Sequence, residues 1–262
     1  MSYVVICLVA IVVSGLTLFS GFGLGTLLMP AFALFFPVEI AVGATAVVHL
    51  ANNIFKAFLV GRKANLAVVL KFALPGAVAA VFGALLLNYV SGLKPLAEYS
   101  LAGKAFMIAP ANLMVAVLIM VFGLIELSSR FEQLKFDMRF IPLGGFISGF
   151  FGGLSGHQGA LRSAFLLRAG LQKEAFVGTG VLCSVVVDFS RLVVYGVTFF
   201  SKQLTVLEHQ DVTGLVFAGC LSAFFGAFIG ARLLKKITLR GIQVTVGVML
   251  ILLSVALGMG FV

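Results

Sequence analysis

Four polar side chains share one helical face inside an apolar stretch and could bind an anion or exchange a proton. They are His49, Asn52, Asn53 and Lys56, at positions i, i+3, i+4 and i+7. In a membrane, an ionisable side chain is costly, so it requires a partner or a function. We interpret Asn52, Asn53 and Lys56 as anion-binding residues and His49 as a candidate for proton coupling. Two alternatives stay open: Lys56 could extend its amine to the nearby aqueous interface, and His49 could be a hydrogen-bonded core residue.

A second polar face occurs later in the chain. Ser184, Asp188 and Arg191 lie at i, i+4 and i+7, and Tyr195 follows four residues on. We interpret Arg191 as an anion-binding residue and Asp188 as a second candidate for proton coupling. The spacing also permits a local ion pair between Asp188 and Arg191. Both interpretations can hold, because a paired arginine still has donors for a substrate.

A glycine-rich break precedes each polar face. The first runs from Ser20 to Gly25 as SGFGLG, and the second from Gly152 to Gly159 as GGLSGHQG. Glycines allow the backbone to turn. A helix that restarts after such a turn has N–H groups without intrahelical partners, and these suit an anion. We therefore expect backbone contacts with an anion at Gly25 and Gly159.

The second break carries polar side chains that have no counterparts in the first. Ser155, His157 and Gln158 lie within it, and Arg162 follows in the next apolar arm. The planar fork of an arginine can hold two oxygens of a sulfonate or carboxylate at once. We expect all four residues to contact the anion and to decide which anion is chosen. Arg162 could instead pair with a helix C-terminus or with Asp188.

The composition places these residues in a membrane. Hydrophobic residues make up 61% of the 262 residues and charged residues only 10%, whereas a soluble domain is about a quarter charged. Eight apolar blocks are near or above the length that spans a bilayer. They cover residues 3–36, 39–61, 65–90, 105–127, 140–169, 174–200, 212–234 and 238–261. The first and fifth are the longest, and the glycine breaks interrupt them.

The lysines and arginines distinguish two topologies. If all eight blocks cross, the loop residues divide eight against seven between the two sides. If the first and fifth blocks are re-entrant hairpins, twelve share one face: Arg62, Lys63, Lys71, Arg130, Lys135, Arg139, Arg168, Lys173, Arg232, Lys235, Lys236 and Arg240. Only Lys94, Lys104 and Lys202 then lie on the other. The strong bias favours the hairpins, with both termini outside, although residues 3–20 alone are long enough to span.

The two halves of the chain resemble each other. A shift of 134 pairs Gly25 with Gly159, and a shift of 135 pairs Asn53 with Asp188 and Lys56 with Arg191. We predict an all-α polytopic membrane protein with two four-segment repeats, inverted relative to each other. Each repeat is a glycine-broken hairpin plus three transmembrane helices. The single transmembrane domain, residues 1–262, comprises repeat 1 at about 1–127, a cytoplasmic loop at about 128–138 and repeat 2 at about 139–262.

Several other features of the chain are interpreted as structural. Glu39 and Glu174 begin the spans after the hairpins, where an acid complements the helix dipole. Gly43 and Gly178 are expected to allow close helix packing. The three cysteines have no metal-ligand spacing. The net charge of +9 is explained by topology signals rather than by nucleic-acid binding. The N-terminus is interpreted as an uncleaved first membrane segment.

These motifs resemble the sulfite exporter TauE/SafE family, also called the TSUP transporters. The first copy of the pattern comprises Ser14-Gly15, Gly21 to Gly25, Met29-Pro30 and Ala41 to Thr45. The second comprises Ser148-Gly149, Gly152 to Gly159 and Phe176 to Gly180. The triple glycine of the family is broken in both copies, and His157, Gln158 and Arg162 stand where the family is usually apolar or glycine. The resemblance implies a permease of the bacterial inner membrane for small anions, often sulfite or organosulfonates.

We therefore expect a secondary transporter of a small, sulfur-containing or organic anion, which binds at the midplane between the repeats. No paired carboxylates, metal-ligand spacing or phosphate loop indicates an enzyme, a metal site or a cofactor. The expected partners are the anion and the lipid bilayer, with protons as the candidate coupling ion; the oligomeric state is not predicted. The alternatives are a non-transporting membrane sensor or partner subunit, and an intramembrane enzyme built around Asp188 or His157. The absence of a long soluble tail disfavours a receptor.

Overall fold

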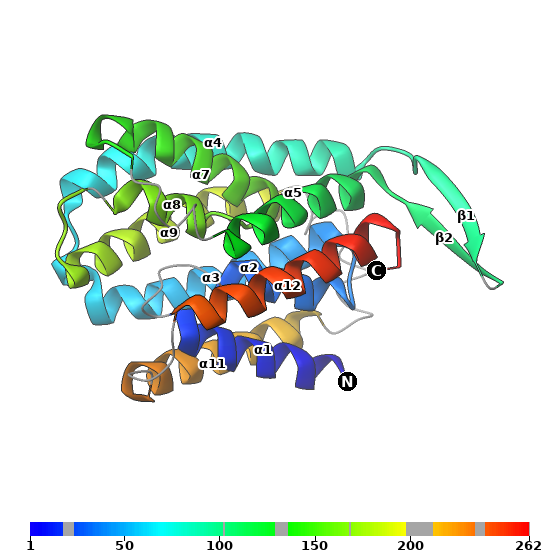
Figure 1. Cartoon of the computed structure of the whole chain (residues 1–262), viewed down its shortest axis with the longest axis horizontal. Coiled ribbons are helices and arrows are strands. Elements are labelled where there is room, and N and C mark those ends of the chain that lie inside the picture. The colour runs from blue at the N-terminus through cyan, green and yellow to red at the C-terminus, as the bar shows by residue number, and fades with distance from the viewer. Residues whose placement is uncertain are drawn as a thin grey trace.

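The computed structural model describes residues 1–17, 24–101, 103–128, 136–167, 169–197, 212–233 and 239–261. The chain is a bundle of helices with one small β-hairpin (Figure 1). Five of its described helices are long and apolar enough to cross a membrane. They are α3 (Val38–Val60), α4 (Leu66–Ser91), α5 (Pro110–Leu127), α9 (Lys173–Tyr195) and α11 (Val212–Leu233). The last helix is α12 (Leu239–Gly258). The predicted all-α polytopic class is confirmed.

Each of the two longest apolar blocks contains a pair of described helices, and the predicted break is confirmed in the second block. The first pair is α1 (Ser2–Thr17) and α2 (Leu24–Ala33), and the second is α7 (Ile141–Ser155) and α8 (Gly159–Leu166). The first glycine tip, residues 18–23, lies outside the described residues. The second break occurs at Gly156, whose φ of 84° suits a glycine at a helix C-terminus.

The helix α8 returns along α7, so the second break forms a hairpin. Ser148 Oγ in the middle of α7 donates to the carbonyl oxygen of Gln158 at 2.8 Å. Near the open ends of the hairpin, a Cβ on Gly144 would collide with the side chain of Phe165. Phe165 also stacks on Phe136, which precedes α7, at a centroid distance of 4.2 Å. The hairpin therefore begins and ends on the same side of the bundle, as a re-entrant segment does.

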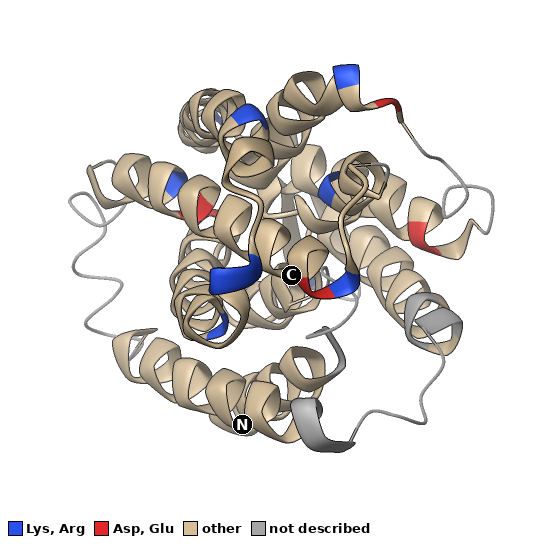
Figure 2. Cartoon of the chain, turned by 90° about the vertical axis from the view of Figure 1, so that its left-hand side faces the viewer, with Lys and Arg blue, Asp and Glu red and all other residues tan. Residues whose placement is uncertain are grey.

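The bundle has two chemically different ends. The basic end contains the short helix η1 (Gly61–Lys63) and the starts of α4, α7 and α9. The start of α9 is tied to this end because Asn65 N donates to Thr179 Oγ1 at 2.9 Å. The described basic side chains of the basic end are Arg62, Lys63, Lys71, Arg139 and Lys173. In Figure 2 this end faces the viewer. Lys94 and Lys104 lie at the opposite end, together with the two termini (Figure 1).

This charge distribution agrees with the predicted topology as far as the described residues go. Six of the other basic residues in the prediction lie outside them: Arg130, Lys135, Arg168, Lys202, Lys235 and Lys236. The side chains of Arg232 and Arg240 are likewise not described. By the positive-inside rule, we expect the basic end to face the cytoplasm.

A β-hairpin at the other end was not predicted. The strands β1 (Ala97–Leu101) and β2 (Lys104–Ile108) pair antiparallel and project from the bundle (Figure 1). Tyr99 stacks on Phe106, and Tyr99 OH donates to the carbonyl of Met259 at 2.5 Å. The fourth apolar block, predicted from residue 105, thus begins as a strand, and its helix starts at Pro110. Apolarity alone did not distinguish the two, whereas proline at a first helical position would have marked the start. We call this end the β-hairpin end.

Glycines on α7 bring its backbone against that of α4. A Cβ on Gly145, Gly149 or Gly153 would collide with a backbone carbonyl of α4, and the three glycines are one helical turn apart. In the other half, Gly226 of α11 makes the same approach to the carbonyl of Ile11 on α1. The pairs α4–α7 and α11–α1 are among the most extensive helix contacts. Two related halves would produce this pairing, and the inverted repeat stays a prediction.

The close-packing interpretation is correct for one of its two glycines. A Cβ on Gly178 would come within 2.6 Å of the carbonyl oxygen of Val60, at the turn that ends α3. A Cβ on Gly43 would meet nothing within 4 Å. Gly43 therefore does not serve close packing, and the prediction for it is wrong. A sequence pattern does not show which side of a helix has a neighbour.

Gly149→Ala is expected to destabilise the protein, because the added methyl group forces α7 away from α4. Overpacking of this kind costs about 1–3 kcal/mol. The matched control is Gly43→Ala, also inside a helix, where alanine lowers the backbone entropy of the unfolded chain and should stabilise by up to about 1 kcal/mol. Thermal unfolding of both purified variants, followed by helical circular dichroism, measures the difference. Equal melting temperatures would contradict the proposed packing.

Candidate functional site

Asp188 lies at the centre of a buried polar cluster that joins the two halves of the chain. Its carboxylate is 0% exposed and accepts hydrogen bonds from α3, α9 and the tip of the α7–α8 hairpin. His49 Nδ1 lies 2.6 Å from Oδ2, and Gln158 Nε2 donates to Oδ1 at 2.9 Å. Arg191 donates to Oδ1 from Nε at 3.0 Å and from NH2 at 2.7 Å. The local ion pair is therefore present, and the charge of Asp188 is compensated.

Arg191 and Tyr195 hold the end of α7. Arg191 NH1 donates to the carbonyl of Gly152 at 3.0 Å, and Tyr195 OH donates to the carbonyl of Gly153. The carbonyl of Gly152 also accepts from Gly156 N at 3.0 Å, so the two side chains add hydrogen bonds to the helix end at the break. In this structure Arg191 contacts the carboxylate and the hairpin tip, and its role as an anion ligand stays a prediction.

Two further cationic side chains, one from each half, are buried in the same region of the bundle. Lys56 on α3 and Arg162 on α8 are each 5% exposed and close enough for their positive charges to repel. Arg162 NH1 donates to Ser184 Oγ. Lys56 makes no hydrogen bond or ion pair with any residue that the structure describes. The lysine is buried, so the alternative in which its amine reaches the aqueous interface does not apply here.

The two hairpins approach each other beside this cluster. A Cβ on Gly25, in the first turn of α2, would lie 3.1 Å from the carbonyl oxygen of Gly156. It would also lie 3.7 Å from the ring of His49. The start of α2, the tip before Gly159 and the polar face of α3 are thus in contact. Of the predicted residues, Gly25 thus lies beside the second hairpin tip, and Asn53 approaches Asp188 across the halves.

A comparison with protein families matched residues 4–257 to the family described as Sulfite exporter TauE/SafE. The match extends over nearly the whole chain, across both halves. The chain belongs to the TauE/SafE family. The suspected resemblance is confirmed, and membership makes the chain a multi-pass membrane transporter of sulfur-containing anions. No match was found among curated proteins or among solved structures.

In this TauE/SafE chain the second hairpin tip divides its polar residues between two directions. Gln158 points to Asp188, whereas the ring of His157 stacks on that of Phe122 in α5, with the ring centroids 5.2 Å apart. His157 Nδ1 donates to the carbonyl of Ser155 at 3.0 Å, and Ser155 Oγ donates to the carbonyl of Phe151 at 3.2 Å. His157 and Ser155 are therefore not brought into the Asp188 cluster. His157 Nε2 is buried and has no hydrogen-bond partner within the described residues.

Asn52 and Asn53 also diverge. Asn53 Nδ2 lies 3.4 Å from Asp188 Oδ2. Asn52 instead faces α1, where its Oδ1 accepts from Ser14 Oγ at 3.2 Å. Its Nδ2 is buried and has no hydrogen-bond partner among the residues that the structure describes. One hundred degrees of helical rotation separates consecutive residues, which explains why these neighbours reach different helices.

Thr45 is a polar residue of the same face that the motif analysis missed. Its side chain is 0% exposed and its hydroxyl has no partner among the described residues. The missed signal is spacing: Thr45 lies four residues before His49 and seven before Asn52. A threonine in an apolar helix indicates a binding site less strongly than a charged residue does, because its hydroxyl commonly hydrogen-bonds to the backbone of its own helix.

Proposed function

We propose that this TauE/SafE transporter moves sulfite or a small organosulfonate by secondary active transport and binds it between the two halves, beside Lys56 and Arg162. The supporting observation is Lys56: a buried cation from the first half, next to a second cation from the other half, without an acidic partner among the described residues. A buried charge without a counter-charge is strongly unfavourable. A bound oxyanion would supply that counter-charge.

The chemistry of the surrounding groups suits an oxyanion. The guanidinium of Arg162 can hold two oxygens, and the ammonium of Lys56 can donate to a third. The starts of α2 and α8 add backbone N–H groups at the positive ends of two helices. Asp188 does not oppose an anion strongly, because Arg191 already compensates its charge and His49 also contacts the carboxylate. We infer roles for His157 and Ser155 only after a movement of the hairpin tip.

The position of the site between the halves supports alternating access. Lys56, His49 and Asn53 belong to the first half, and Arg162, Asp188 and Gln158 to the second. Movement of one half against the other would open these contacts to either side of the membrane. We propose that this membrane is the bacterial inner membrane. The transport energy then comes from an ion or substrate gradient.

Counterflow in proteoliposomes tests the proposal. Vesicles loaded with unlabelled 2-hydroxyethanesulfonate are expected to accumulate the labelled anion, and Arg162→Gln is expected to reduce the initial rate at least about tenfold, because a charge-assisted hydrogen bond is lost. The matched control is Arg62→Gln, an exposed arginine at the basic end, which should transport normally. Anion binding without flux would contradict the proposal and support a partner subunit or sensor.

The contact between His49 and Asp188 is our candidate for proton coupling. The pair links the two halves, and Arg191 and Arg162 are the charged groups that also act on the histidine. A proton taken up there changes the balance of charge that holds α3 to α9. His49→Gln is expected to abolish accumulation driven by a pH gradient while exchange of anion for anion continues. Retained gradient-driven accumulation in this variant would exclude His49 as the coupling residue.

A further inference from the structure

A cavity of about 470 Å³ lies at the β-hairpin end of the bundle. It is lined by the exit of α2, the start of α3, the last turn of α4 and the start of α5. Ser91 on α4 also belongs to the lining, and its hydroxyl is buried with no hydrogen-bond partner in the described part of the chain. Because the opposite end is the basic one, this cavity is expected to open on the outer side of the membrane.

One face of α3 leads from this cavity to the proposed anion site. Six residues share the face, at alternating spacings of four and three: Val38, Val42, Thr45, His49, Asn52 and Lys56. We call this set the α3 stripe. Val38 lines the cavity, and the stripe is apolar at its first two positions and polar at the other four.

The polar part of the α3 stripe contains two buried groups that lack a hydrogen-bond partner among the described residues. The Thr45 hydroxyl and Asn52 Nδ2 are both buried in residues that are 0% exposed, and neither forms a hydrogen bond within the described residues. Buried polar groups in proteins are almost always satisfied. Two such groups on either side of His49, followed by the cation of Lys56, indicate a series of contacts for a polar ligand.

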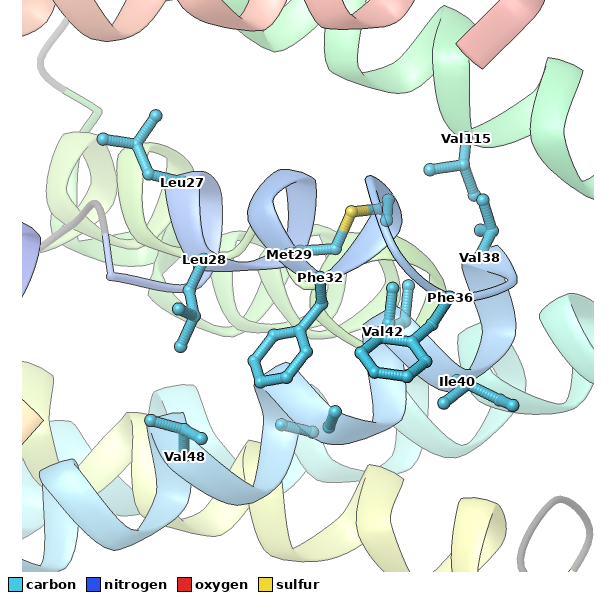
Figure 3. Close-up of a cluster of buried hydrophobic side chains, with 14 of the residues drawn as sticks. Leu27, Leu28, Met29, Phe32, Phe36, Val38, Ile40, Val42, Val48 and Val115 are labelled. Carbon is cyan, nitrogen blue, oxygen red and sulfur yellow. The ribbon is translucent and has the colours of Figure 1, made fainter. Parts of the chain in front are cut away.

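Apolar side chains separate the cavity from Thr45. Phe32 and Phe36 point from α2 and its exit toward α3 (Figure 3), and their ring centroids lie 6.2 Å apart. Both belong with Val42 to one buried apolar cluster. Phe36 also lines the cavity. An ion cannot pass a dry contact of this kind without a large cost of dehydration.

The helix α2, which carries Phe32, is short, buried along its whole length and interrupted by a proline. The helix α2 has ten residues and contains Pro30, which removes one of its hydrogen bonds. Its first turn touches the second hairpin tip and His49 through Gly25. Occupation of the anion site would therefore act directly on the helix whose other end closes the path.

We propose that the α3 stripe lines the transport path, that the cavity is its outer mouth, and that Phe32, Phe36 and Val42 form the gate that is closed in this structure. Thr45 is then the first polar contact inside the gate. The proposal rests on the proposed function, because it takes the anion site as the inner end of the path.

Accessibility of single cysteines to a membrane-impermeant thiol reagent tests the path without a transport assay. In a background without Cys7, Cys183 and Cys220, the changes Leu93→Cys and Thr45→Cys place one thiol in the cavity lining, at a residue that is 45% exposed, and one inside the gate. In right-side-out vesicles, the thiol at position 93 should react at least about tenfold faster than the thiol at position 45, because the latter needs a local opening. A control is Val78→Cys on the exposed, lipid-facing side of α4, which should not react with a charged reagent.

Opening of the gate supplies the decisive comparison. Adding Phe36→Ala to the Thr45→Cys protein should raise its labelling rate at least about tenfold, since the dry contact is lost. Val42→Ala is the second gate variant, in case the first does not fold. An unreactive thiol at position 93, equal reactivity at positions 93 and 45, or unchanged labelling in a folded gate variant would each overturn the proposal. The anion-binding role of Lys56 is measured separately, so failure of either proposal is distinguishable from failure of the other.

Discussion

Asp188→Asn is expected to destabilise the protein by about 3–5 kcal/mol, the range observed when one partner of a buried ion pair is removed. Asparagine preserves the shape of the side chain but not its charge. Arg191, which is also fully buried, would then lack its counter-ion. The cluster would hold three cations, Arg191, Lys56 and Arg162, without the carboxylate. The measurement is the loss of helical circular dichroism on heating the purified protein.

The matched control is Glu174→Asn, which removes an exposed carboxylate from the first turn of the same helix. Its loss should cost no more than about 1 kcal/mol. The double variant Asp188→Asn with Arg191→Met should recover part of the lost stability, because it removes the uncompensated cation as well. If Asp188→Asn is as stable as the control, the carboxylate does not hold the two halves together.

Lys56→Met is expected to have opposite effects on stability and on binding. The empty protein should be stabilised by about 1–4 kcal/mol, because a buried cation that has no ion-pair partner among the described residues is replaced by an apolar side chain of similar length. The affinity for 2-hydroxyethanesulfonate should fall about ten- to a hundredfold, which corresponds to the loss of one charge-assisted hydrogen bond. Thermal unfolding and equilibrium binding to the purified protein measure the two effects.

Lys63→Met is the control for this change, because Lys63 is exposed at the basic end and should alter neither quantity. A stabilised Lys56 variant that binds the anion as well as the original protein would remove Lys56 from the site. A destabilised variant would show that its amine has a structural partner. The combination of a more stable protein and weaker binding is specific to a residue kept for its ligand.

Spacing along the chain was enough to predict which polar residues share a helix face, but not which helix each one meets. Asn52 and Asn53 were assigned to one site, yet one faces Ser14 on α1 and the other faces Asp188 on α9. His157 and Gln158 are also neighbours with different partners. Small rotations about a helix axis or a turn separate them, and only the packing of the other helices shows the result.

The β-hairpin and Gly43 illustrate a second limit of local patterns. Residues 104–108 are as apolar as the helix that follows, so hydropathy extended that block into a strand. Gly43 matches Gly178 in the aligned halves, but only Gly178 has a backbone close by. In both cases the deciding quantity is a contact with a distant segment, which composition and periodicity do not contain.

The sequence by itself determined the membrane class and the family, because these follow from composition and from the spacing of motifs, and it predicted the glycine breaks and the polar residues of the proposed site. The tertiary structure decided which charges are compensated. His49 and Gln158 meet Asp188 from 139 and 30 residues away, and together with Arg191 they satisfy its carboxylate. Lys56 is buried and has no acidic partner in the described part of the chain, although in the sequence it stands only six residues before the exposed Arg62. Pairing and burial depend on which helices pack together, and that is why the residue with the clearest need for an anion could be identified only in the folded chain.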